Sequence, residues 1–233
     1  MKKERIWELD ALRGLCILGM IVIHFFYDLT AFGGIELSLP AWFVFVRKYG
    51  HVLFILISGI CVTFSSSSVK RGVIVFACGL LVSYVTLYMD AVVGLRDIRI
   101  WFGILHLLGV CMLLYPLFRR LPHWAMALCA LVFIALGFYL QGIRINLNYL
   151  FPLGLRGQDF FTGSDYFPLF PGLGWFLLGA AIGKSAYRSR KSLLPRVNAD
   201  AALIRALRFC GRHSLELYLL HQPILALGVF LFC

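Results

Sequence analysis

Apolar residues run along the chain in blocks, and short polar or basic segments separate one block from the next. An α-helix needs about 20 mainly apolar residues to cross the hydrocarbon core of a bilayer, and most of the blocks have that length. We expect seven membrane-spanning helices, at residues 13–32, 42–64, 72–90, 99–118, 123–141, 166–186 and 212–231. The pattern therefore predicts an all-α integral membrane protein with a single domain over residues 1–233.

The composition excludes an ordinary soluble domain, because 61% of the 233 residues are hydrophobic and only 14% are charged. The seven cysteines are spread along the chain without a CxxC pair. This spacing indicates neither a zinc site nor a disulfide framework, and we expect no bound metal. Glu4, Glu8 and Asp10 precede the first apolar block, so we expect a retained first helix rather than a cleaved signal peptide.

The formal net charge is +11, but the basic residues stand between apolar blocks rather than on one soluble face. This distribution favours membrane topology over nucleic-acid binding as the reason for the charge. With the N-terminus in the cytoplasm, 16 of the 22 lysines and arginines lie on the inner side and six on the outer side. The positive-inside rule therefore predicts a cytoplasmic N-terminus and an external C-terminus. We expect a multi-pass protein of a bacterial cytoplasmic (inner) membrane, in contact with membrane lipid.

Two connections are long, and in this topology they lie on opposite sides of the membrane. The outer connection covers residues 142–165, and the inner one, residues 187–211, is basic. Apolar residues recur at helical spacing over residues 201–209, which predicts a helix in the membrane interface. The sequence shows no internal repeat, whereas many transporters are built from repeats.

Four histidines lie within the expected spans, each on a different helix: His24, His51, His106 and His221. Ionisable side chains inside a membrane are costly and mark candidate functional sites. A single histidine of this kind is more often one that is bonded to a neighbouring helix. Four of them favour a shared polar cavity.

His24 follows Arg13 by eleven residues, which is close to three helical turns. Both side chains are therefore expected on one helix face, separated by roughly 16 Å along the axis. Asp28 lies one turn beyond His24, where its carboxylate is expected to accept a hydrogen bond from the imidazole and raise its basicity. The alternative is that Arg13 pairs with Asp10 at the interface while Asp28 is hydrated.

Ser214, Tyr218 and His221 form a polar stripe on one face of the last span. Pro223 follows, and we expect it to open the helix there. Arg47 and His51 form a similar one-turn pair in the second span. Both groups are candidates for substrate contacts or for interface anchors, and the sequence leaves this choice open.

Several of these segments resemble the heparan-alpha-glucosaminide N-acetyltransferase catalytic family, within the wider transmembrane acyltransferase superfamily. The more specific matches lie at the two ends, and the weaker ones are glycine-rich apolar segments. The matching strings are ELDALRGLCILGMIVIHFFYDL (8–29), FILISGICVTFS (54–65), RIWFGILHLLGV (99–110), DYFPLFPGLGWFLLGAAIGK (165–184) and GRHSLELYLLHQPIL (211–225).

The resemblance implies acyl transfer across the membrane, from cytoplasmic acyl-CoA to an amino or hydroxyl group of a sugar or envelope glycan. In related bacterial membrane O-acyltransferases, an arginine followed after ten residues by a histidine is the functional motif, and Arg13 and His24 match it. The chain departs from the lysosomal members in two ways. It lacks their lumenal histidine in residues 33–41, and it is much shorter.

We therefore expect His24 and Asp28 to be catalytic, with His24 acting as a general base or accepting the acyl group. The phosphates of acetyl-CoA or another acyl-CoA are expected at an inner cationic rim of Arg13, Lys184, Arg208 and Arg212. The expected cavity or substrate contacts are His51, His106, Ser214, Tyr218 and His221.

Two other functional classes fit parts of the pattern. Histidines on several helices are also how membrane cytochromes hold haem, although di-haem bundles typically place two histidines on each of two helices. A small transporter or channel would also have a polar cavity. The sequence leaves open whether chains associate in the membrane.

The charge asymmetry predicts that the C-terminus is exported. An alkaline phosphatase fused after Cys233 should be active, because this enzyme works only outside the cytoplasm. A fluorescent protein that matures only in the cytoplasm should stay dark at the same site. The opposite pair of results would contradict the topology.

Overall fold

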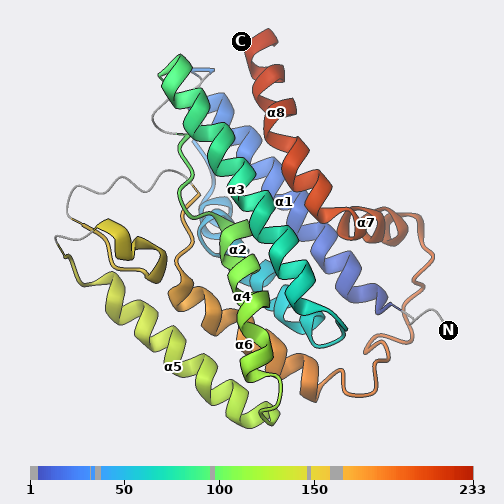
Figure 1. Ribbon diagram of the computed structural model, residues 1–233. Helices are drawn as coiled ribbons and strands as arrows, with labels where there is room; N and C mark the ends of the chain where they lie inside the picture. Colours follow the sequence, from blue (N-terminus) through green and yellow to red (C-terminus); the bar gives the residue numbers. More distant parts are fainter. Residues whose placement is uncertain are drawn as a thin grey trace. The chain divides into compact units, whose positions relative to one another are not determined.

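The computed structural model describes residues 5–31, 33–34, 38–94, 98–145, 148–157 and 165–232, and these are almost entirely helical without strands (Figure 1). Residues 146–147 and 158–164 of the expected outer connection lie outside the described part. The helices are α1 (Trp7–Ala31), α2 (Ala41–Val62), α3 (Ser68–Val93), α4 (Ile104–Phe118), α5 (His123–Gln141), η2 (Asn148–Leu153), α6 (Leu169–Ser185), α7 (Ala202–Arg212) and α8 (Ser214–Phe232).

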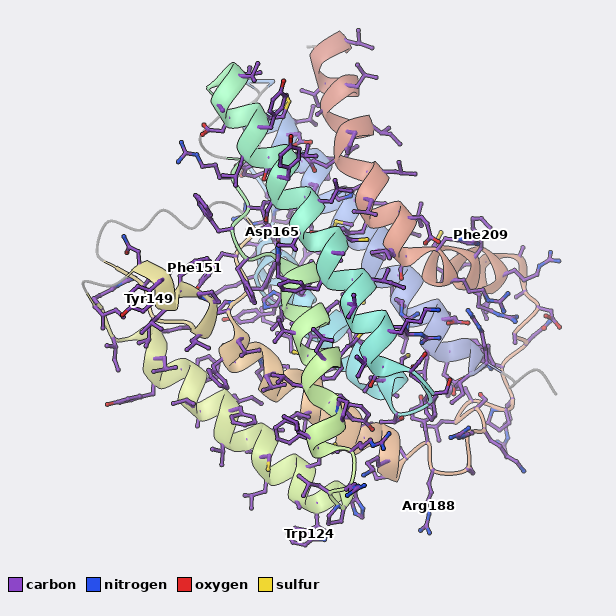
Figure 2. The ribbon with its side chains drawn as sticks, viewed as in Figure 1. Trp124, Tyr149, Phe151, Asp165, Arg188 and Phe209 are labelled. Atoms are coloured by element: carbon purple, nitrogen blue, oxygen red, sulfur yellow. The ribbon has the colours of Figure 1, made fainter. Side chains whose placement is uncertain are left out.

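The chain is an all-α membrane protein. Among the described residues, α1, α2, α3 and α5 are long and apolar enough to cross a bilayer, and α4 is apolar but shorter. On α5, the exposed rings of Trp124 and Tyr139 stand near opposite ends, where aromatic side chains favour the membrane interfaces. Figure 2 shows Trp124 at one end of this helix. The number of seven crossings and their orientation stay predictions.

Every expected span contains a helix, but several bounds differ. The bounds of α5 were predicted correctly, whereas α1 begins at Trp7, because the acidic residues Glu8 and Asp10 stabilise the first turn of a helix. Helix α4 begins only at Ile104. The expectation that Pro223 opens the last helix was wrong, because α8 continues through it. A proline removes only one N–H, and a membrane helix tolerates this loss.

The contacts divide the chain into two units, residues 1–57 with 189–233 and residues 58–188. In the first unit, α1 packs against α7 and α8 (Figure 1). A Cβ atom on Gly14 would lie 2.0 Å from the carbonyl oxygen of Leu207, and one on Gly211 would lie 1.8 Å from that of Asp10. The backbones of α1 and α7 therefore cross in direct contact, which only glycine permits.

Helix α7 is the short amphipathic helix that the sequence predicted over residues 201–209. One side lies against α1, while Leu203 and Phe209 are exposed on the other, and Figure 2 shows Phe209 on the outer side of the helix. Its location in the membrane interface stays a prediction.

The second unit consists of the end of α2, of α3 to α6 and of η2, and its main helix pairs are α3 with α4 and α5 with α6. Lys184, at the end of α6, donates hydrogen bonds to the carbonyl oxygens of Arg119 and Leu121 in the turn between α4 and α5. These bonds satisfy carbonyl groups at the end of α4.

The glycine crossing can be tested with a matched pair of variants. Gly14→Ala should force α1 and α7 apart and destabilise the protein by roughly 1–3 kcal/mol, the usual cost of overpacking. Gly19→Ala is the control, because a Cβ at this position of the same helix meets nothing within 4 Å. Melting temperatures in detergent measure both effects. Equal melting temperatures for the two variants would contradict the close crossing.

Candidate active site

A wide, open cleft of about 1110 Å³ lies in the first unit, between the start of α1, helix α7 and the segment before α7. Its lining holds five cations and one carboxylate, together with the indole of Trp7. The lining residues are Arg5, Ile6, Trp7, Arg190, Lys191, Ser192, Ala199, Asp200, Arg208, Arg212 and His213.

Buried carboxylates of α1 hold the walls of this cleft together. Asp10, which is 6% exposed, accepts a hydrogen bond from Nε of Arg212 at 3.4 Å and lies 3.9 Å from Nη1 of Arg5. Glu8 accepts a bond of 2.7 Å from the backbone N–H of Leu193 and so ties the segment before α7 to α1. Asp10 thus fixes Arg5 and Arg212 in place, and Glu8 fixes the segment before α7.

Arg208 holds the other end of the same segment. Its Nη1 donates to the carbonyl oxygen of Ala199 at 3.0 Å and lies 3.6 Å from the Asp200 carboxylate. Among the described residues, Arg190 and Lys191 form no ion pair. A preformed cleft with this excess of cations suits a ligand that carries several phosphates.

A pair of histidines lies further along α1, between α1 and α8. The rings of His24 and His221 have centroids 4.9 Å apart and planes tilted by 49°. His24 follows Asp10 by 14 residues, an axial rise of roughly 21 Å. The cleft at the start of α1 and the histidine pair are therefore separated along one helix.

Each histidine of this pair uses Nδ1 for a bond to its own helix. Nδ1 of His24 lies 3.1 Å from the carbonyl oxygen of Met20, and Nδ1 of His221 lies 2.5 Å from that of Tyr218. A carbonyl oxygen only accepts, so Nδ1 carries the proton in both neutral rings. Nε2 of each ring is then the basic nitrogen.

Asp28 is fully buried, and both of its carboxylate oxygens accept hydrogen bonds of 3.0 Å from the side-chain amide of Gln222. The expected bond between Asp28 and His24 is therefore not formed among the described residues. The amide nitrogen of Gln222 serves both carboxylate oxygens, whereas the Nδ1–H of His24 is used within α1.

His106 lies in the second unit and is a packed histidine with complete hydrogen bonding. Its Nδ1 accepts a bond from the N–H of Gly103 at 3.2 Å, so the proton is on Nε2, which lies 3.4 Å from the Ser83 hydroxyl. The rings of Phe76 and Phe102 enclose it. These contacts explain the residue as a cap at the start of α4.

The other residues singled out in the sequence lie in several places. Arg13 is at the α1–α7 crossing, where Nη1 donates to the carbonyl oxygen of Gly211 at 3.4 Å and so caps the end of α7. Lys184 bonds carbonyl groups of the second unit. His51 is half-buried on α2, and Ser214 and Tyr218 are half-buried on α8.

Sequence reasoning missed three of the five cations of the cleft, Arg5, Arg190 and Lys191, and also the indole of Trp7. The basic segment over residues 187–211 contained the signal, but its charge was assigned to topology. The contact between His24 and His221 was also not foreseen, because residues 197 positions apart along the chain carry no local pattern that pairs them.

Residues 5–223 match the family model described as "Heparan-alpha-glucosaminide N-acetyltransferase, catalytic". This range covers nearly the whole chain and includes both the cationic cleft and the histidine pair. Comparisons with curated proteins and with solved structures found no match.

Proposed function

We propose that the chain, which belongs to the heparan-alpha-glucosaminide N-acetyltransferase catalytic family, transfers an acyl group from acyl-CoA to a glycan across the membrane. The family makes it a membrane acyltransferase. Acetyl-CoA or another acyl-CoA is the proposed donor. An amino or hydroxyl group of a sugar or envelope glycan is the proposed acceptor, in a bacterial cytoplasmic membrane.

The cation-lined cleft is the observation that supports acyl-CoA as the donor. Coenzyme A ends in a nucleotide with three phosphate groups, and five cations surround the cleft. We assign Arg208 and Arg212 to the phosphates, as the sequence suggested, and add Arg5, Arg190 and Lys191. The indole of Trp7 offers the adenine a surface for stacking. Arg13 then supports the cleft through α7, and Lys184 is given a structural role.

The histidine pair is the observation that supports a location for the acyl-transfer step. In the proposed topology the cleft faces the cytoplasm, and the pantetheine arm extends along α1 until its thioester reaches His24. Nε2 of His24 is free of the bonds that Nδ1 makes, so it is placed to take the acceptor proton as the acceptor attacks the thioester carbonyl. The carboxylate of Asp28, one turn away, favours the imidazolium that forms.

The haem alternative has a geometric difficulty at this pair. Two axial histidines face each other through the iron with the macrocycle between them, whereas the rings of His24 and His221 are in direct contact at 4.9 Å. We therefore expect purified protein to be colourless and to lack a Soret band.

The donor assignment predicts that acetyl-CoA stabilises the purified protein against heat. A ligand that binds only the folded state contributes about 2.7 kcal/mol at one hundred times its Kd. Arg190→Gln and Lys191→Gln should each weaken acetyl-CoA binding about tenfold, since a hydrogen bond to a charged group contributes about 1.5–3 kcal/mol.

Exposed cations in the first turn of α3 provide the control for this measurement. Lys70→Gln and Arg71→Gln remove the same charge outside the cleft and should leave the thermal shift unchanged. Dephospho-CoA, which lacks the phosphate on the ribose, should stabilise less than CoA. No stabilisation of the wild-type protein by millimolar acetyl-CoA would refute the donor.

The catalytic assignment predicts that turnover depends on His24. His24→Ala should lower acyl transfer by about 10²–10⁴-fold, the usual contribution of a general base, and should leave donor binding intact. Asp28→Asn should lower the rate less severely, because it keeps the hydrogen-bonding shape and removes only the charge. Activity per folded molecule is the measurement. Near-wild-type activity of folded His24→Ala would contradict the mechanism.

A further inference from the structure

His221 has a buried nitrogen that the proposed mechanism does not use. The residue is 8% exposed, and its Nε2 has no hydrogen-bond partner among the described residues. A buried polar atom without a partner is costly, and in a native protein it calls for an explanation. The neighbouring Oε1 of Gln222 is also buried without a partner in the described part of the chain. The polar groups between α1 and α8 are thus only partly satisfied.

The hydrogen bonds of the ring nitrogens distinguish the pair of His24 and His221 from His106, the packed histidine of the second unit. In His106 both ring nitrogens lie within hydrogen-bond distance of polar groups. In His221 the Nδ1–H is used by the carbonyl oxygen of Tyr218, which leaves the lone pair on Nε2 free to accept a proton. A residue kept only for packing does not require this free base.

The surroundings allow at most one added proton on the pair at a time. Two imidazolium rings with centroids 4.9 Å apart would repel each other strongly in a site of low polarity. Asp28 is a fully buried carboxylate whose side-chain partner among the described residues is the neutral amide of Gln222. While one added proton is on the pair, this carboxylate compensates its positive charge, because a buried charge without compensation is unfavourable.

We infer that His221 is a second catalytic residue, which receives the acceptor's proton from His24 and delivers it to the departing CoA thiolate. The inference rests on the proposed function. It gives the two histidines different tasks within one proton path, and it explains the free Nε2 of His221.

The step balances in atoms and charge. The amino or hydroxyl group of the acceptor attacks the thioester carbonyl carbon and loses its proton to Nε2 of His24. The C–S bond then breaks, and its electron pair leaves with the CoA thiolate. The proton passes from His24 to Nε2 of His221, directly or through one water, and then to the sulfur. The products are acylated acceptor and free CoA thiol, and both imidazoles are neutral again.

The experiment compares His221→Asn, His221→Gln and His24→Gln with the double variant His24→Gln/His221→Gln in liposomes. The probe reaction is release of CoA thiol from acetyl-CoA, with glucosamine as the acceptor and with water alone. The amide of asparagine lies near the position of Nδ1, so His221→Asn can keep the bond to Tyr218 but supplies no base. His123→Asn, an exposed histidine at the start of α5, is the control and should behave as wild type.

Each single variant of His221 should lower kcat about 10²-fold or more while the KM for acetyl-CoA stays unchanged. The double variant should be no slower than the slower single variant, because residues that act as one unit are not additive. Melting temperatures and monodisperse elution establish that each variant is folded, and kcat is expressed per folded molecule.

The other outcomes identify which claim fails. Wild-type kcat in folded His221→Asn would overturn the inference and leave the proposed function standing. Losses that multiply in the double variant would also overturn it, since they would mean that the histidines act separately. No thiol release above that of empty liposomes by the wild-type protein would overturn the proposed function itself, and the inference with it.

Discussion

The direct contact between the backbones of α1 and α7 is the constraint on which the first unit depends. Gly14 and Gly211 leave no room for a side chain where the two helices cross. This crossing places the start of α1, with Glu8 and Asp10, beside the basic end of α7. Because α8 begins only two residues after α7 ends, the same crossing also sets where α8 starts along α1. The cationic cleft and the histidine pair both follow from it.

Polar groups within the apolar helices show a second consequence of the membrane, where few water molecules are present to satisfy them. His106 and its neighbours form a closed set of hydrogen bonds, and Asp28 is held by Gln222. The pair of His24 and His221 differs, because the Nδ1–H of each ring donates a hydrogen bond to a carbonyl oxygen of its own helix and Nε2 carries no proton. This difference in tautomer distinguishes a histidine that caps a helix from histidines that are able to take up a proton.

Much of the fold was readable from the sequence, since a membrane helix must be both long and apolar. Residues 123–141 show this most clearly, because His123–Gln141 is the helix observed. Hydropathy misplaced the start of α1, because the polar first turn from Trp7 continues the helix beyond the apolar block. It also misplaced α4, whose start is set by the cap between Gly103 and His106.

The candidate site was only partly readable. The spacing of Arg13 and His24 and the basic segment before α8 pointed to α1 and α7, which form the candidate site, but spacing along one helix says nothing about its neighbour. Asp28 lies one turn from His24 and yet bonds Gln222, which is 194 residues away in sequence. Likewise, Arg13 caps α7 instead of lining the cleft. The bonding partners of Asp28 and Arg13 depend on which helices pack together, and a single glycine at a helix crossing can decide this packing.

The central claim is that acyl-CoA binds with its nucleotide in the cationic cleft and its thioester at the histidine pair. A cryo-electron microscopy structure of the protein with acetyl-CoA, in a lipid nanodisc, tests it most directly. The account predicts nucleotide density against Arg190, Lys191 and Arg212, with the acetyl group within reach of Nε2 of His24. Density for acetyl-CoA elsewhere on the protein, with the cleft empty, would contradict it.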